Sequence, residues 1–197
     1  MQEVDLGKAR AALRDEFSRY VSFTDEVWAD IRNRWAVRTF RKKQILLAQG
    51  EVEHHFYFLL EGVHRLYFLD RKSADQTVAF GYPPNFSGNL YSLTTQQPSH
   101  YFLEALSDGA MLALPATDLR ALYDTYPTMD RWGRQFYQDI LVSRGKRERE
   151  MMTMTAVERF HRLLRESPHV FQLVPHKYLA SYIGMRPETF SRMWKNV

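Results

Sequence analysis

The feature that most constrains this fold is a glycine turn between two short amphipathic patterns near the C-terminal end. Leu179, Ala180 and Ile183 have the i, i+1, i+4 spacing of one helix face, and Gly184 follows them at once. A glycine there can take the positive φ that a sharp exit from a helix requires, and Pro187 presets the start of a second helix. The pattern predicts two short helices that cross steeply, with the small side chain of Ala180 at their contact.

The outer face of this predicted hairpin carries side chains suited to nucleic acid. Arginine can form two hydrogen bonds with a guanine edge, glutamate can accept from a cytosine amine, and serine, threonine and lysine suit phosphates. The alternative is a surface hairpin whose charges are only solvated. Because the spacing and the exposed chemistry agree, we predict binding to double-stranded DNA. The predicted DNA-binding residues are Lys177, Arg186, Glu188, Thr189, Ser191, Arg192 and Lys195.

Positive charge is concentrated in the segment that holds the hairpin. Residues 144–197 contain 11 lysines and arginines against 5 acids, whereas the whole chain contains 27 against 23. A local excess of positive charge is the electrostatic footprint of a polyanion-binding surface. The charge distribution therefore favours the same partner as the hairpin chemistry.

The segment His176–Arg192 closely resembles the helix-turn-helix of Crp/Fnr-type bacterial transcription regulators, above all in its Glu-Thr-x-Ser-Arg core. The resemblance implies that Glu188 and Arg192 read bases and that Ser191 contacts a phosphate. Two features depart from the family pattern. Arg186 stands where a helix-capping Ser or Thr is usual, and the sequence ends before the β-hairpin wing that commonly follows. We therefore expect phosphate contacts without a wing.

Short β-rich runs separated by turns fill the middle of the chain. Six or more short strands at this spacing predict a compact β-sandwich or β-roll, and apolar residues at three- and four-residue steps in residues 6–34 predict helices that pack on it. The order of Gly50-Glu51, Tyr57–Gly62 and Gly88–Leu90 resembles the cyclic-nucleotide-binding β-roll of the same family. The runs are Ala36–Phe40, Gln44–Ala48, His55–Leu60, Val63–Leu69, Gln76–Tyr82, His100–Leu106 and Met111–Leu114.

In that family the roll cradles a cyclic phosphate, and the resemblance implies an effector pocket here. Asn89 stands where the family has a ribose-binding Glu, and Ser99 and His100 stand where Arg and Ser are usual. No Arg or Lys lies between Lys72 and Arg120, so a charge-assisted contact with the phosphate is missing. We therefore predict that cyclic AMP is not bound tightly; another small molecule and a purely structural role both stay open. The candidate pocket residues are Gly88, Asn89, Leu90, Ser99 and His100.

A long helix is predicted between the roll and the hairpin. After Pro115 the pattern indicates one helix over Ala116–Tyr126 and a longer one that extends to about Thr153. In the resembling family this helix pairs with its twin, which implies a homodimer whose hairpins read half-sites about one DNA turn apart. The alternative is that the apolar stripe packs on its own roll, and both can hold in part. The stripe consists of Met129, Trp132, Phe136 and Ile140.

Two charge patterns lie near the junction with the hairpin domain. Arg144 and Glu148 are i, i+4 partners in a charged run, which predicts a solvated helix face. The sequence Thr155-Ala-Val-Glu158 is a capping box that opens a further helix. On that helix we expect Val157, Phe160, Leu163 and Leu164 to face inward and Arg159, Arg162 and Arg165 to face outward.

Composition excludes several classes of protein. The chain has no cysteine, so it has no disulfide, thiolate metal site or cysteine-ligated iron–sulfur cluster, and we expect no cofactor. No run of about 18 apolar residues is present, so we expect no membrane span. The first residues are polar and mixed in charge, unlike a signal peptide. A cytoplasmic location is the resulting expectation.

Histidines in a β-roll raise the alternative of a cupin-like metalloenzyme. His54 and His55 are adjacent, and adjacent residues on a strand point to opposite faces. His64 and His100 lie far along the chain, and Glu61 does not fit the cupin spacing, so we expect ordinary histidines and no metal. Ser-His-Asp spacing, a Walker loop and a nucleophile elbow are absent, so we expect a protein that is not an enzyme.

Together the patterns predict an α+β chain with N-terminal helices, an antiparallel β-roll of the double-stranded β-helix kind, a long connecting helix and a helix-turn-helix domain. We expect a helical lead and sensor roll in residues 1–114, a helix pair in 115–153 and a DNA-binding domain in 154–197. The predicted function is a sequence-specific DNA-binding transcription regulator, with RNA polymerase as a further expected partner. The alternative is a ligand-binding or protein-interaction module that has lost DNA binding.

Overall fold

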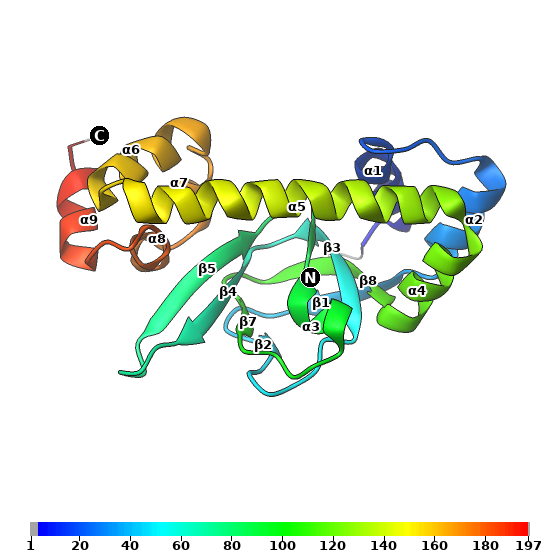
Figure 1. Ribbon diagram of the computed structural model, residues 1–197, viewed down its shortest axis with the longest axis horizontal. Coiled ribbons are helices and arrows are strands. Elements are labelled where there is room, and N and C mark those ends of the chain that lie inside the picture. Colours follow the sequence, from blue (N-terminus) through cyan, green and yellow to red (C-terminus); the bar gives the residue numbers. More distant parts are fainter. Residues whose placement is uncertain (1–3, 197) are drawn as a thin grey trace.

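Helices frame the chain at both ends in the computed structural model, which describes residues 4–196 (Figure 1). The first begins after Asp5, whose carboxylate accepts two backbone hydrogen bonds, and the second begins after Thr24, whose hydroxyl accepts from the N–H of Val27. The helices are α1 (Leu6–Ser18), α2 (Asp25–Asn33), α3 (Leu90–Thr95), α4 (Ala116–Thr125), α5 (Pro127–Thr153), α6 (Ala156–Glu166), α7 (Val170–Leu173), α8 (His176–Ile183) and α9 (Pro187–Trp194).

Two antiparallel sheets form the β-roll that lies beneath α5 in Figure 1. In the described part of the chain, the strand order is β1-β8-β3-β6 in one sheet and β2-β7-β4-β5 in the other, so β5 lies at a sheet edge. The strands are β1 (Ala36–Phe40), β2 (Ile45–Leu47), β3 (His55–Glu61), β4 (His64–Leu69), β5 (Asp75–Gly81), β6 (Asn85–Ser87), β7 (Phe102–Ala105) and β8 (Gly109–Pro115). The predicted α+β class and antiparallel roll are confirmed.

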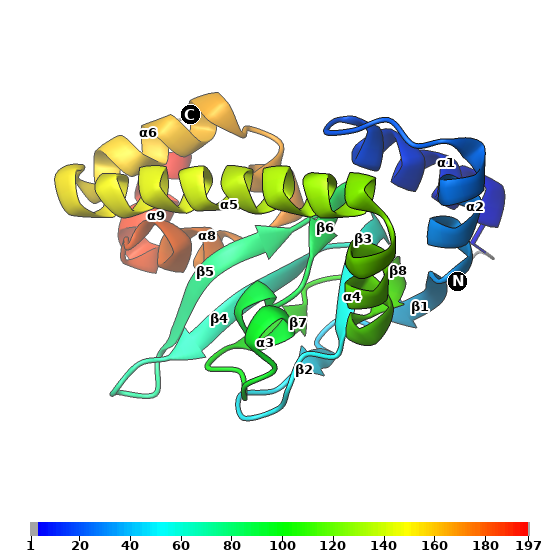
Figure 2. The same cartoon turned by 45° about the vertical axis from the view of Figure 1, so that its right-hand side comes forward.

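An aromatic cluster joins the roll, the N-terminal helices and α5. Trp132 of α5 is fully buried, and its ring centroid lies 4.5 Å from that of Phe17 and 5.1 Å from that of Phe86. Phe136, one turn later, stacks on Trp132 at 5.1 Å and meets Phe56 of β3 edge to face. Aromatic pairs in these geometries add to the stabilisation from buried area. This core holds the first half of α5 across the roll (Figure 2).

The apolar stripe of α5 packs on its own chain. Met129, Trp132 and Phe136 are buried, and Ile140 is partly buried against the same core. The packing alternative therefore holds for Met129, Trp132 and Phe136, whereas Ile140 stays partly exposed, and a dimer contact through this stripe remains a prediction. The exposed apolar residues of the second half of α5 are Leu141, Val142, Met151 and Met152.

A second core builds the C-terminal domain from α6 to α9. Phe160 of α6 and Phe190 of α9 are fully buried with ring centroids 5.2 Å apart, and Phe171 of α7 lies within 6.0 Å of both. The capping box is present as expected, because Thr155 and Glu158 exchange hydrogen bonds. This apolar core lies at the far end of α5 (Figure 1), and Val63 and Leu106 of the roll are buried in the same cluster.

Several local expectations were wrong. Asn85–Ser87, expected as turn and loop, forms the short strand β6, because its backbone pairs with Tyr57–Leu59 of β3. Val157 was expected to face inward but is exposed. Arg159 and Arg162 were expected to face outward but turn toward neighbouring helices, where Arg159 bonds backbone carbonyls and Arg162 pairs with Glu150. Only Arg165 of the three points to solvent.

Within residues 4–196, no helix combines the length and the apolarity that crossing a membrane requires.

Candidate nucleic-acid interface and cavity

The outer face of α9 lies at the end of the molecule, with α8 between it and the sheet (Figure 1). Of the predicted DNA-binding residues, all are exposed except Thr189, which is half-buried. The ion pairs of the C-terminal domain within residues 4–196 use other bases, Arg162 and Arg165. Arg186, Glu188 and Arg192 are therefore all accessible, and their i, i+4 spacing places Glu188 and Arg192 on one face of α9.

The sharp turn before α9 sets the direction of this face. Gly184 ends α8 and has a φ of +66°. This left-handed backbone conformation is rarely adopted by residues other than glycine. Arg186 occupies the N-cap position of α9 without a side-chain capping bond, and Pro187 begins the helix. Phe190 anchors the opposite face in the core, so the polar residues of α9 point away from it.

Arg159 of α6 stabilises the turn between α8 and α9. Its Nε donates to the carbonyl of Ile183 at 2.8 Å, and its Nη1 donates to the carbonyls of Met154 and, at 3.5 Å, Glu150. These carbonyls lie at the C-terminal ends of α8 and α5, where helices leave backbone acceptors without an internal partner. One guanidinium thus ties the end of α5 to the turn of the hairpin.

We expect Arg159→Met to lower the free energy of unfolding of the C-terminal domain by about 2 kcal/mol, because it removes charge-assisted donors from several helix-end carbonyls. Denaturant unfolding followed by hydrogen exchange in residues 156–196 measures the loss. Arg165→Met is the matched control: that side chain is exposed and its only ion pair within residues 4–196 is at 3.7 Å, so the cost should stay under about 0.5 kcal/mol. Equal losses in both variants would contradict the bracing role.

A cavity of about 640 Å³ lies where the roll, α5 and α8 meet. Its wall is apolar and polar in about equal parts, and its apolar side chains come from β4, β5 and β7 on one side and from Phe136 and Ile140 of α5 on the other. Two arginines of α5, Arg144 and Arg147, also line it, together with the acid Glu148 and with Tyr182 of α8. A helix distant in sequence therefore brings two positive charges and one negative charge to a cavity whose roll residues include no Arg or Lys.

Arg147 connects the cavity to the hairpin. Its guanidinium lies 3.5 Å from the centroid of the Tyr182 ring and donates a hydrogen bond to the backbone carbonyl of Tyr182. Burial lowers the pKa of Arg147 from its usual value, although the side chain stays charged at neutral pH. The expectation of a purely solvated helix face in this run was wrong at this position.

The candidate pocket residues divide into two groups. Gly88 and Leu90 line the cavity. Asn89 and Ser99 are buried behind it, where the Asn89 amide donates to the Ser99 hydroxyl at 2.6 Å and that hydroxyl donates to the carbonyl of Tyr101. His100 is exposed, outside the cavity, and lies against Tyr91. Asn89 and Ser99, at the positions where the family binds ribose and phosphate, therefore bond to each other.

A buried carboxylate lies beneath this loop. Glu53 is 2% exposed, and its Oε1 accepts from the N–H of His55 and the hydroxyl of Tyr57, while its Oε2 has no partner within residues 4–196. Oε2 lies 3.9 Å from the point where a Cβ on Gly88 would stand. Burial raises the pKa of Glu53 to about 7, against an ordinary value of 4.5. An ionisable carboxylate therefore faces the loop that holds a phosphate in the resembling family.

The histidines of the roll occupy separate environments. His64 is fully buried and bonds the hydroxyl of Ser87, and burial lowers its pKa to about 4. His55 lies 2.7 Å from the guanidinium of Arg38. Among the described residues, no three His, Asp or Glu side chains gather as a set of metal ligands.

The sequence patterns did not identify Glu53, Arg65, Arg144, Arg147, Ser181 and Tyr182 as members of any site. Their contacts join segments far apart in the chain, and no motif of adjacent residues marks them. The one local signal was chemical: the base Arg65 stands in a β-rich run where apolar residues prevail.

Comparison with known proteins gives the following likenesses. Residues 37–126 match the cyclic nucleotide-binding domain family. No curated protein matches the chain in sequence.

Solved structures share its fold over most of their length. FixK2 from Bradyrhizobium japonicum has a TM-score of 0.72 at 19% identity, over 82% of this chain and 83% of that one. The global regulator CLP of Xanthomonas campestris, described as responsive to c-di-GMP, has a TM-score of 0.64 at 13% identity, over 88% and 91%. The Thermus thermophilus catabolite activator protein has a TM-score of 0.58 at 20% identity, over 90% and 84%. At these identities the likeness concerns the fold.

Proposed function

We propose, from the premise that residues 37–126 belong to the cyclic nucleotide-binding domain family and that the chain has the fold of Crp/Fnr regulators, that this protein is a sequence-specific DNA-binding transcription regulator. The observation that carries the proposal is the accessible row of Arg186, Glu188 and Arg192 on α9. A second helix of a helix-turn-helix places such a row in the major groove, where arginine bonds guanine and glutamate accepts from cytosine. The protein acts by binding and not by catalysis.

The proposed effector differs from cyclic AMP. The buried bond between Asn89 and Ser99 occupies the groups that would hold ribose and phosphate, and an ionised Glu53 beneath Gly88 would repel a phosphate. The cavity instead suits a small molecule with an apolar body and an anionic group directed to Arg144 and Arg147. Because Tyr182 forms part of the wall, such a ligand would touch the sensor and the hairpin together, and would act by favouring one of their arrangements.

The proposed oligomer is a homodimer along the exposed part of α5. Leu141 is 70% exposed, and with Val142, Met151 and Met152 it leaves apolar side chains on the surface of a helix that runs to the DNA-binding end. Two copies joined there would present two α9 helices to one DNA duplex, as two half-sites require.

We expect Arg192→Ala to reduce discrimination at one base pair of the binding site by about 1–3 kcal/mol, because it removes a contact with a single base edge. Duplexes taken from a selected pool, each changed at one base pair, are compared by competition binding at fixed salt. The matched control is Arg165→Ala, an exposed arginine on α6 outside the hairpin. If the two variants relaxed the preference equally, Arg192 would not be a base reader.

A further inference from the structure

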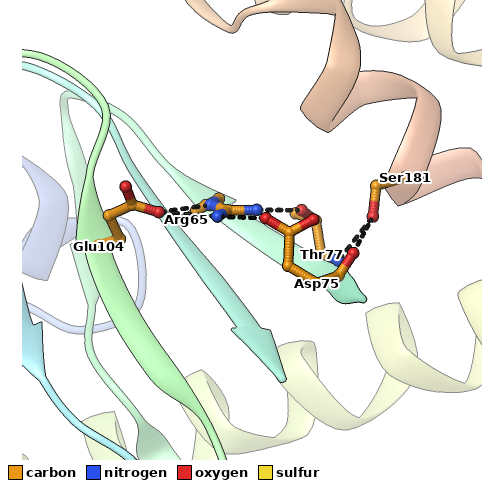
Figure 3. A network of polar contacts seen from close by, with 5 residues as sticks. All are labelled: Arg65, Asp75, Thr77, Glu104 and Ser181. Atoms are coloured by element: carbon orange, nitrogen blue, oxygen red, sulfur yellow. Dashed lines mark hydrogen bonds and ion pairs between the residues drawn. The ribbon is translucent and has the colours of Figure 1, made fainter. Parts of the chain in front are cut away.

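The helix-turn-helix hairpin is held by the β-roll as well as by α5, because its first helix, α8, is docked on β5. β5 is an edge strand, and such strands usually leave backbone N–H and C=O groups unpaired. Here the hydroxyl of Ser181 on α8 accepts from the N–H of Thr77 at 2.9 Å and donates to the carbonyl of Asp75 at 3.1 Å (Figure 3). A single side chain therefore pairs two backbone groups of a strand more than a hundred residues away.

A buried guanidinium supports the same contact from the sheet side. Arg65 of β4 is 3% exposed and donates to Asp75 at 2.6 Å, to Glu104 at 2.8 Å and to the hydroxyl of Thr77 at 3.3 Å (Figure 3). Burial alone would lower the pKa of Arg65. The hydrogen bonds that Arg65 donates to the carboxylates of Asp75 and Glu104 outweigh this effect and keep the pKa above its usual value. Arg65 thus orders the segment of β5 that receives Ser181.

The guanidinium also contacts α8 directly. Its central carbon lies 3.8 Å from the ring centroid of Tyr178, with the ring of Tyr67 at 4.0 Å, so Arg65 meets one aromatic ring from each domain. Phe80 of β5 and Tyr182 of α8 add a ring contact at 5.2 Å. We call the set Arg65, Thr77, Tyr178 and Ser181 the latch.

The latch uses a face of α8 that the hairpin itself does not need. Leu179, Ala180 and Ile183 face the domain core, whereas Tyr178 and Ser181 face β5. Docking therefore leaves the outer face of α9 accessible while it restricts the angle between α9 and α5. The latch is polar and aromatic, as interfaces between domains often are, and it adjoins an apolar cluster in which residues of the roll and of α8 are buried together.

We propose that Arg65 and Ser181 are positioning residues for DNA reading, which act through α8 by holding α9 at a fixed orientation to α5. This inference rests on the proposed function. When the latch is released, the hairpin samples other orientations, and the apparent dissociation constant rises as the docked fraction falls. The loss involves no DNA contact, so the base preference and the number of phosphates bound stay the same.

The test uses Ser181→Ala and Tyr178→Leu, singly and together, in the full chain. Arg65→Met is a weaker choice because it leaves the mostly buried Glu104 without its partner and can disturb the sheet. Hydrogen exchange at the Thr77 amide reads docking without DNA, and we expect it to quicken about tenfold or more in the double variant. Ser167→Ala, in the same domain but outside the latch, is the control and should leave exchange at Thr77 unchanged.

DNA binding is then measured on a duplex selected with the wild type. We expect about tenfold weaker binding in the double variant, with the slope of log affinity against log salt and the base preference unchanged. Unchanged exchange would overturn the latch, and faster exchange with equal or tighter DNA binding would overturn the positioning role. A wild type that binds no duplex would overturn the proposed function and the positioning role with it, while the exchange result would still show whether α8 docks.

Discussion

Phe190→Ala is expected to lower the free energy of unfolding of the C-terminal domain by about 3–5 kcal/mol and to abolish DNA binding. Phe190 is fully buried and meets Phe160 and Phe171, and His176 of α8 also packs against its ring. A domain of this size has few other large side chains with which to fill the space. Loss of this ring therefore removes the anchor that orients the polar face of α9.

Hydrogen exchange resolved by segment measures this prediction. Amides in residues 156–196 should lose protection, whereas amides around the aromatic cluster at Trp132 should keep it, because the two cores are separate. Thr189→Ala, the preceding residue on the same helix, is half-buried and is the control, with a cost of about 1 kcal/mol or less. Protection that falls equally in both regions would show that the domain has no stability of its own.

The second large effect concerns the pH dependence of stability. The pKa of Glu53 in the folded protein, about 7, exceeds its ordinary value of 4.5, so the folded state keeps a proton that the unfolded chain releases. The contribution of Glu53 to the free energy of unfolding is fully present below pH 4.5, and it falls by about 3 kcal/mol as pH rises to about 7. His64 has the opposite effect: its folded pKa of about 4 lies below 6.5, so stability is lost as pH falls between those values.

In the wild type, the contributions of Glu53 and His64 to the pH dependence of the unfolding free energy have opposite signs and nearly cancel. The variant Glu53→Gln removes the first and leaves the second. We expect the difference in unfolding free energy between variant and wild type to grow in favour of the variant by about 3 kcal/mol from pH 4.5 to pH 7. The variant alone should then become less stable as pH falls, because His64 and carboxylates with a lowered pKa, such as Asp30, all act in that direction. Chemical denaturation at a series of pH values measures both curves, and parallel curves would show that folding does not raise the pKa of Glu53.

The architecture could be predicted because its signals are local. The apolar spacing of Leu179 and Ile183, the glycine at 184 and the capping box at Thr155 each act within one or two helical turns, and each appears in the structure as expected. The turn residues that separate the strands act over similar distances. The short strand β6 was not predicted, because its formation depends on pairing with β3 and not on its own composition.

The contacts that join the domains could not be predicted in the same way. Ser181 and Thr77 lie 104 residues apart, and no local pattern indicates that a serine on α8 will pair the edge of β5. The same holds for Arg147, which carries a charge into the cavity although it belongs to a run that has the i, i+4 pattern of a solvated helix. The helical period identifies which faces are polar, but the partner of a polar face depends on how the domains meet.

The central claim is that the outer face of α9 reads a specific DNA sequence. Its most direct test is selection of bound duplexes from a random pool with the wild-type chain at low salt, followed by sequencing of the bound fraction. We expect enrichment of a palindrome whose half-site centres lie about 10 base pairs apart, because two copies of α9 must enter successive major grooves. A bound pool with the same composition as the starting pool would contradict it.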